Sequence, residues 1–180
     1  KKLRGMFAFV IYNKETNELF GARDHFGIKP FYYYKQDDLF IYGSEIKSFL
    51  EHPNFKKELN EEALKPYLTF QFSALEETFF KNVFKLKEGH LFTYKDGNMN
   101  IEQYYKINYE SSNQSEEELI EEINEQIEKS VECHKNSDVK LGAFLSGGVD
   151  SSYIAATLMP DNTFSVGFER EHFNEVDQAR

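Results

Sequence analysis

Apolar and polar residues alternate in short runs along the first part of the chain, which is the pattern of half-buried strands. Four such runs, separated by polar turns, predict strands at 6–13, 19–24, 29–36 and 39–45. Because the connections are short, we expect these strands to pair in order as an antiparallel meander with alternating faces.

Two short helices are predicted next. Ser44 can cap a helix over 44–50, and Asn60 can cap one over 60–70 whose first turn is acidic. Pro66 lies inside the second helix. Since proline lacks an N–H and clashes with the preceding turn, we expect that helix to end or kink there.

Strand pattern returns over 83–107, with a turn at 88–89 and an Asp-Gly hairpin at 95–98. Residues 1–107 therefore predict one α+β domain built on antiparallel strands. The polar stretch 108–115 is the predicted linker to a second domain.

The second part, 116–180, has a different pattern of apolar and polar residues. Ser115 and Glu118 form a capping-box pattern at the start of a helix over 115–135. Its apolar residues recur at helical spacing, and they are Leu119, Ile123, Ile127 and Val131. Cys133 lies in this helix, where we expect it to be semi-buried and without a catalytic role.

A strand at 139–145, a helix at 151–159 and a strand at 163–168 follow. Strand, helix and strand without a hairpin-length turn form a βαβ unit, so the two strands should be parallel. We interpret 116–180 as the opening of an α/β parallel-sheet domain.

Composition and charge exclude some classes of function. The formal net charge is −10 over 180 residues, which argues against a general electrostatic hold on nucleic acid or on an anionic membrane. The single cysteine excludes an internal disulfide and fits a reducing cytoplasm. No apolar run is long enough to span a membrane. The chain begins with lysine rather than methionine, enters a predicted strand almost immediately and stops in a helical pattern, so we expect an internal piece of a longer protein.

The glycine loop after Leu145 carries the chemistry. Ser146, Gly147 and Gly148 stand at the carboxyl end of a predicted strand and just before a helix. Ligands of open α/β sheets bind at such ends, and N–H groups at a helix N-terminus attract anions. Glycines let a ligand approach the backbone closely. The loop therefore suits a phosphate or pyrophosphate group.

Asp150 would repel such a ligand unless a cation lay between them. Mg²⁺ is commonly held by one or two carboxylates together with phosphate oxygens, so Asp150 indicates a metal–polyphosphate complex. The structural alternative is a plain strand–helix corner in which Asp150 or Ser151 caps the helix. The loop is not a Walker motif, because no lysine follows the second glycine.

Two segments carry a family resemblance. "LSGGVDSS" (145–152) resembles the pyrophosphate loop of the ATP pyrophosphatase family, and an adenine nucleotide alpha hydrolase-like domain is what it implies. "LRGMFAFVIYNKETNELFGARDHFGIKPFYYY" (3–34), with "IYGSEIKSFL" (41–50), is similar to the second half of a class II glutamine amidotransferase domain, which has an Ntn-type fold. That order of domains is the layout of the glutamine-dependent asparagine synthetase family.

The resemblance implies a carbon–nitrogen ligase that converts aspartate to asparagine through β-aspartyl-AMP, with ATP and Mg²⁺ as cofactors and glutamine as nitrogen donor. The resemblance is also compatible with a homodimer of the complete protein. The matching positions for ATP and pyrophosphate are Leu145, Ser146, Gly147, Gly148, Asp150, Ser151 and Val166, with Asp150 as the Mg²⁺ ligand.

Other parts of the family pattern do not match. The family's catalytic cysteine stands at the mature N-terminus, where this chain has Lys1, and its second ATP motif would lie beyond Arg180. We therefore expect this piece alone to be inactive. A β-lactam synthetase-like enzyme and a non-catalytic remnant are the alternatives.

The stretch 21–30 also invites a catalytic interpretation. We expect Arg23, Asp24 and Gly27 to form a hydrogen-bonded turn that stiffens the first domain, with His25 as a turn residue. Polar residues after the last predicted strand could approach ATP, and they are Arg170, Glu171 and Glu175.

Overall fold

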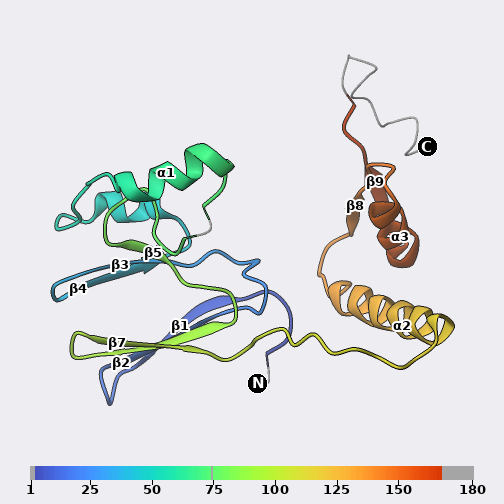
Figure 1. The fold of residues 1–180 in the computed structure, drawn as a ribbon, viewed down its shortest axis with the longest axis horizontal. Coiled ribbons are helices and arrows are strands. Elements are labelled where there is room, and N and C mark those ends of the chain that lie inside the picture. Colours follow the sequence, from blue (N-terminus) through green and yellow to red (C-terminus); the bar gives the residue numbers. More distant parts are fainter. Residues whose placement is uncertain (1–2, 74, 168–180) are drawn as a thin grey trace. The chain divides into compact units, whose positions relative to one another are not determined.

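The computed structural model describes residues 3–73 and 75–167 (Figure 1). It divides into two compact units, Lys1–Tyr109 and Glu110–Arg180. Each unit is described by itself below.

The first unit contains a four-stranded antiparallel sheet with the order β1-β2-β6-β7. Its strands are β1 (Ala8–Asn13), β2 (Glu18–Arg23), β6 (His90–Lys95) and β7 (Asn98–Gln103). The predicted Asp-Gly hairpin joins β6 to β7. Asp96 and Gly97 have φ values of 49° and 77°, which is the left-handed pair that a tight hairpin turn requires. That prediction is confirmed.

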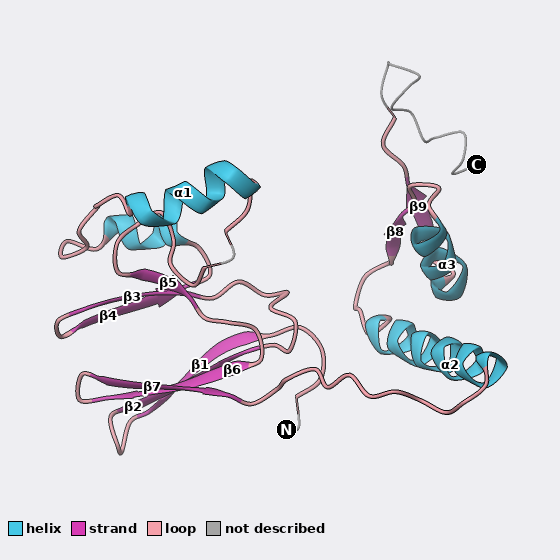
Figure 2. Ribbon diagram, viewed as in Figure 1, coloured by secondary structure: helices cyan, strands magenta, loops and turns pink. Residues whose placement is uncertain are grey.

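A second antiparallel sheet has the order β4-β3-β5, with strands β3 (Tyr32–Gln36), β4 (Leu39–Gly43) and β5 (Val83–Lys85). The expectation of one continuous meander is therefore wrong. β2 pairs with β6 rather than with β3, because residues 24–31 leave the first sheet and carry the chain to the second. Figure 2 shows the two sheets as separate layers.

The main core lies between these sheets. Its buried residues are Phe31, Tyr33, Leu86 and Phe92. Tyr33 points to this core, whereas its neighbours Tyr32 and Tyr34 belong to the cluster on the other face of the same sheet. The predicted alternation of faces is confirmed here, and it lets one short strand supply two cores.

The second cluster packs the β4-β3-β5 sheet against a 3-10 helix, η1 (Ile46–Glu51), through Phe49, which is fully buried. The helix predicted at 44–50 thus exists, but its cap is different. Glu45 occupies the N-cap position and no side chain caps the helix. Such a short 3-10 helix gains its stability from burying Phe49 and does not need the cap.

Helix α1 (Glu61–Phe70) continues through Pro66, so the prediction that it ends there is wrong. Proline removes only the one N–H that would reach back to Glu62, and Tyr67 still supplies the carbonyl that receives the N–H of Gln71 at 2.7 Å. Asn60 stands at the N-cap position but makes no side-chain cap.

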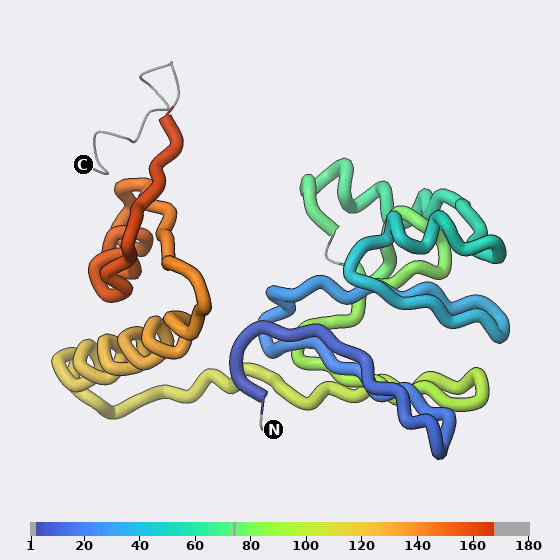
Figure 3. Tube along the Cα trace, turned by 180° about the vertical axis from the view of Figure 1, so that it is seen from behind, coloured from blue at the N-terminus to red at the C-terminus, as the bar shows by residue number. Residues whose placement is uncertain are grey.

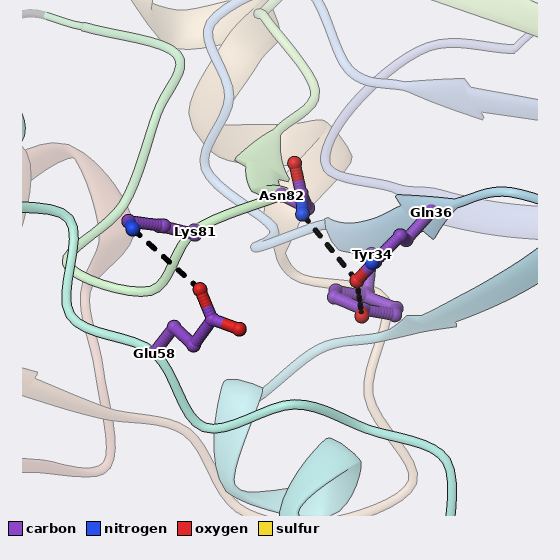
Figure 4. Close-up of polar contacts among 5 residues, drawn as sticks. All are labelled: Tyr34, Gln36, Glu58, Lys81 and Asn82. Carbon is purple, nitrogen blue, oxygen red and sulfur yellow. Dashed lines mark hydrogen bonds and ion pairs between the residues drawn. The ribbon is translucent and has the colours of Figure 1, made fainter.

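Polar contacts tie the β3 end of the second sheet to the turn before β5 (Figure 4). Gln36 receives hydrogen bonds from the hydroxyl of Tyr34 and, at 3.5 Å, from the side-chain amide of Asn82. The next residue back, Lys81, forms an ion pair with Glu58 at 3.5 Å. The buried tyrosine hydroxyl is thereby paired, as buried polar groups almost always are.

The second unit contains α2 (Glu116–His134), β8 (Gly142–Phe144), α3 (Val149–Leu158) and β9 (Asn162–Phe164). The predicted capping box is present, with hydrogen bonds of 2.9 and 3.2 Å between Ser115 and Glu118. β8 and β9 pair in parallel, as the βαβ pattern predicts, and the tube view shows β9 returning beside β8 (Figure 3).

Several details of this unit differ from expectation. The strands predicted at 139–145 and 163–168 are shorter, because β8 covers only Gly142–Phe144 and β9 only Asn162–Phe164. Cys133 is exposed rather than semi-buried, because Val131 rather than Cys133 occupies the buried face of α2. Helix α3 begins two residues earlier than predicted, at Val149. Across residues 3–73 and 75–167, the structure has no helix with the length and apolar character needed to cross a membrane.

Candidate functional site: the loop between β8 and α3

The glycine loop joins the end of β8 to the start of α3. Parallel pairing with β9 fixes its first residue, because the N–H of Leu145 donates to the carbonyl of Phe164 at 2.8 Å. Gly147 then adopts φ of +81°, a backbone conformation that residues other than glycine rarely adopt. Gly148 takes an extended conformation at the N-cap position of α3. The backbone thus reverses within three residues and enters the helix.

Hydroxyl groups hold the loop closed from inside. The Oγ atoms of Ser146 and Ser151 lie 3.0 Å apart, and Ser151 Oγ also donates to the carbonyl of Gly148 at 3.1 Å. The N–H of Ser146 reaches Ser151 Oγ at 3.4 Å. These contacts fix the curvature of the loop and leave the following N–H groups for other partners.

Unpaired N–H groups gather at this corner. The N–H groups in the first turn of any helix have no partner within the helix. In α3, no described side chain caps them either. Among the described residues, none accepts a hydrogen bond from the N–H of Gly147 or Gly148. The alternative in which Asp150 or Ser151 caps the helix is wrong, because the cap position belongs to Gly148. The corner therefore offers several donors and the positive end of a helix dipole to an anion.

Asp150 lies in the first turn of α3 and is exposed. In the described part of the chain, no group of three or more His, Cys, Asp or Glu side chains is placed to hold a metal ion. A lone carboxylate still fits Mg²⁺, which keeps several waters and takes its other ligands from phosphate oxygens. The donor set therefore suits a metal that arrives with a polyphosphate.

The two positions expected to flank an adenosine lie on neighbouring strand ends. Leu145 is half-buried, and Val166 is 66% exposed beyond β9. Ser165 links them, since its hydroxyl donates to the carbonyl of Leu145 at 2.7 Å. Sequence reasoning missed this contact, although a serine beside the predicted nucleotide position was visible. The expectations for Arg170, Glu171 and Glu175 lie outside the described residues.

The stretch 21–30 forms the predicted hydrogen-bonded turn. The buried Arg23 side chain donates to the carbonyls of Gly27, Lys29 and Leu86 at 2.6–2.8 Å. Asp24, 1% exposed, accepts the N–H groups of four residues, namely Phe7, Phe26, Ile28 and Lys29. His25 packs edge-on against Tyr105. This confirms a structural role for the turn.

Burial by itself raises the pKa of Asp24, but its backbone hydrogen bonds outweigh burial and hold the pKa below the ordinary value of 3.8. The carboxylate is therefore charged at neutral pH. It holds the chain where β2 ends and the path to the second sheet begins.

Family models match both parts of the chain. The glutamine amidotransferase domain model matches residues 1–105, and the asparagine synthase model matches residues 122–180. The first match covers the unit of two antiparallel sheets, and the second includes the loop between β8 and α3.

Curated relatives from Bacillus subtilis (strain 168) agree with this division. Asparagine synthetase [glutamine-hydrolyzing] 1 is 44% identical over 99% of this chain and 29% of its own length. Asparagine synthetases [glutamine-hydrolyzing] 3 and 2 are 32% and 33% identical over 93% and 95% of this chain, and over 29% and 25% of their own lengths. The chain thus spans less than a third of each of these relatives. Through the match over residues 1–105, it belongs to the glutamine amidotransferase domain family, and it continues into a segment similar to asparagine synthase.

Proposed function

We propose that this chain is the junction between the glutaminase and synthetase parts of a glutamine-dependent asparagine synthetase. The complete protein would amidate aspartate to asparagine with nitrogen from glutamine, through β-aspartyl-AMP, releasing AMP and pyrophosphate. Support comes from the matches over both units and from 44% identity to a relative of that name.

The observation that carries the ATP part is the set of N–H groups at the β8–α3 corner that have no partner among the described residues. In this proposal Gly147, Gly148 and the first turn of α3 bind the pyrophosphate portion of ATP. Ser146 and Ser151 keep the loop in shape and can turn their hydroxyls to phosphate oxygens. A bound polyphosphate would gain from both the N–H donors and the helix dipole.

Asp150 would hold Mg²⁺, which neutralises phosphate charge when it is bound. The carboxylate stands in the turn that carries the N–H donors, so without the metal it would oppose the same anion that they attract. The remaining proposed roles belong to Leu145 and Val166, whose strand ends would border the adenosine. The first unit would belong to the part that hydrolyses glutamine.

Replacing Asp150 by alanine in the complete protein tests this proposal. Aspartate-dependent exchange between ATP and pyrophosphate should be abolished, whereas glutamine hydrolysis should be spared. Asp138→Ala is the matched control, because Asp138 is also an exposed acid of the same unit but lies before β8. Full exchange activity in Asp150→Ala would exclude the metal role.

A further inference from the structure

A cavity of about 230 Å³ lies in the first unit, apart from any motif that the sequence singles out. Its lining comes from residues 73 and 75–80, from the start of η1 and from the paired strands β3 and β5. We call it the Ser73 cavity. An apolar cavity of roughly 150 Å³ holds benzene, so this one has room for an aromatic ring with a short side chain.

Apolar side chains form most of the wall of the Ser73 cavity. They belong to Tyr32, Ile46, Leu75, Phe79 and Phe80. Tyr32, Ile46 and Phe80 also pack against the second core cluster, which fixes this part of the wall. Leu75 and Phe79 remain 39% and 36% exposed. Because covering such surface removes it from water, the wall favours an occupant with an apolar body.

Ser73 supplies a hydroxyl group that lacks a partner. Its Oγ atom is buried and forms no hydrogen bond with any described residue. The threonine hydroxyl of the same lining is paired, because Thr78 Oγ1 donates to the carbonyl of Phe80 at 3.3 Å and accepts its N–H at 3.2 Å. Buried polar groups almost always have a partner, so the Ser73 hydroxyl favours an occupant that brings an acceptor.

Lys85 brings a positive charge to the lining. It is opposite Tyr32 in the β3–β5 register, so the two half-buried residues lie on the same face of the sheet. The ion pairs of the first unit use other lysines, which are Lys47, Lys65, Lys81 and Lys87. Among the described residues, Lys85 therefore has no carboxylate partner, and its ammonium group is available to an anion.

Glu77 also lines the cavity, but its charge acts on the other face of the sheet. It forms an isolated bridge with Phe84, which is opposite Tyr33 and packs with it in the main core. Burial, followed by the carboxylates of Glu76 and Glu77, raises the pKa of Tyr33 to about 12, in agreement with that position. Lys85 is therefore the charge that decides what the Ser73 cavity attracts.

We propose that the Ser73 cavity binds a small monocarboxylate with an apolar body, of the size of 3-phenylpropionate. The carboxylate would pair with Lys85 and accept a hydrogen bond from Ser73 Oγ, while the ring would pack against the apolar wall. An amino acid would place a second charge against that wall without a partner, which disfavours it. The site goes beyond the function proposed above and depends on neither glutamine nor ATP.

Calorimetric titration of the complete protein with 3-phenylpropionate tests this proposal. Binding should be saturable. The uncharged 3-phenylpropionamide keeps the shape and loses the charge, so it should bind about tenfold more weakly or worse. Propionate keeps the charge and lacks the ring, and it should be weakened at least as much, by about tenfold or more.

Variants at Lys85 locate the binding. Lys85→Met should weaken 3-phenylpropionate by about tenfold or more, whereas Lys85→Arg keeps the charge and should retain binding. Lys95→Met is the matched control, because Lys95 is an exposed lysine at the end of β6 and does not line the cavity.

Ser73→Ala provides an independent measurement. It should weaken binding of 3-phenylpropionate by about 3- to 10-fold without lowering the unfolding temperature of the unliganded protein, because it removes a hydroxyl that has no described partner. The proposal would be overturned by the absence of saturable binding, as when another part of the complete protein fills the cavity. Equal affinity in Lys85→Met and the unmodified protein would overturn it as well.

Discussion

The guanidinium of Arg23 donates to the carbonyl of Leu86 at 2.6 Å, across 63 residues of sequence. Arg23 ends β2 in the first sheet, and Leu86 directly follows β5 in the second. One side chain therefore connects the two sheets at the point where the chain passes between them. Its two other acceptors, Gly27 and Lys29, belong to the connecting turn.

Arg23→Lys should destabilise the first unit even though it keeps the charge. An ammonium cannot reproduce the planar set of donors that reaches three separate carbonyls. Hydrogen bonds to charged groups contribute about 1.5–3 kcal/mol each and do not add fully, so we expect the free energy of unfolding to fall by about 2–4 kcal/mol. Urea unfolding measures this. Arg4→Lys, at an exposed position, should leave the urea midpoint unchanged.

The pH dependence of stability should report Asp24. Its pKa is lower in the folded state than the ordinary 3.8, so its contribution to stability is present above that value and disappears as the pH falls through the folded pKa. Asp24→Asn should therefore cost most near pH 7. The difference in urea midpoint from the unmodified protein should shrink below about pH 4.

The exposed acid Asp38 provides the comparison for that experiment. Asp38→Asn should give only a small difference in urea midpoint at pH 7, because its side chain is exposed. If the Asp24→Asn difference stayed constant from pH 7 to pH 3, the buried carboxylate would not be the group that titrates.

Gly21→Ala should destabilise the main core. A Cβ atom built on Gly21 would come within 2.2 Å of the ring of Phe92, which is fully buried. Overpacking of this kind costs about 1–3 kcal/mol in the free energy of unfolding, measured by urea or heat. In the double variant Gly21→Ala/Phe92→Leu, leucine leaves room for the added methyl group. The double variant should therefore lose less free energy of unfolding than the two single variants lose together. Strict additivity would show that the two positions do not compete for space.

Local features of the fold could be predicted from the sequence, whereas long-range pairing could not. The Asp96-Gly97 hairpin depends on its own two φ values, and the pair Ser115 and Glu118 lies within one helical turn. The pairing of β2 with β6 instead depends on the turn centred on Asp24, whose hydrogen bonds turn the chain away from the first sheet. Alternation of apolar residues gives no signal for that choice of partner.

The same distinction applies to the loop between β8 and α3 and to a second cavity of the first unit. The loop after Leu145 is contiguous, so its glycines, hydroxyls and acid could be recognised together, and their binding roles remain predictions. That cavity is lined by residues from distant stretches of the chain, among them Tyr33, Glu76 and Gln103. No spacing along the chain indicates that these side chains share a space, and only the packing of the sheets brings them together.

Ser115→Ala should weaken the start of α2. The serine side chain accepts the N–H of Glu118 at 3.2 Å, and loss of such a cap costs about 1 kcal/mol. Amide hydrogen exchange in the first turn of α2 should accelerate accordingly. Glu118→Gln is the matched control, because glutamine can also return a hydrogen bond to the N–H of Ser115 and keep the box. Unchanged exchange in Ser115→Ala would mean that the serine hydroxyl does not stabilise the first turn of α2.

Gly148→Ala separates the shape of the loop from its proposed contact with pyrophosphate. Gly148 has φ of −74°, and a Cβ there would lie no closer than 3.5 Å to its neighbours, so the fold should tolerate alanine. The added methyl group would nevertheless stand beside the N–H groups that face the proposed anion.

In the complete protein, Gly148→Ala should keep its unfolding temperature while aspartate-dependent ATP–pyrophosphate exchange falls by about 10- to 100-fold, the loss of one charge-assisted hydrogen bond. Gly147→Ala should instead lower both the unfolding temperature and the exchange activity, because a side chain at φ of +81° is strained. Unchanged exchange in Gly148→Ala would mean that no ligand approaches this stretch of backbone closely.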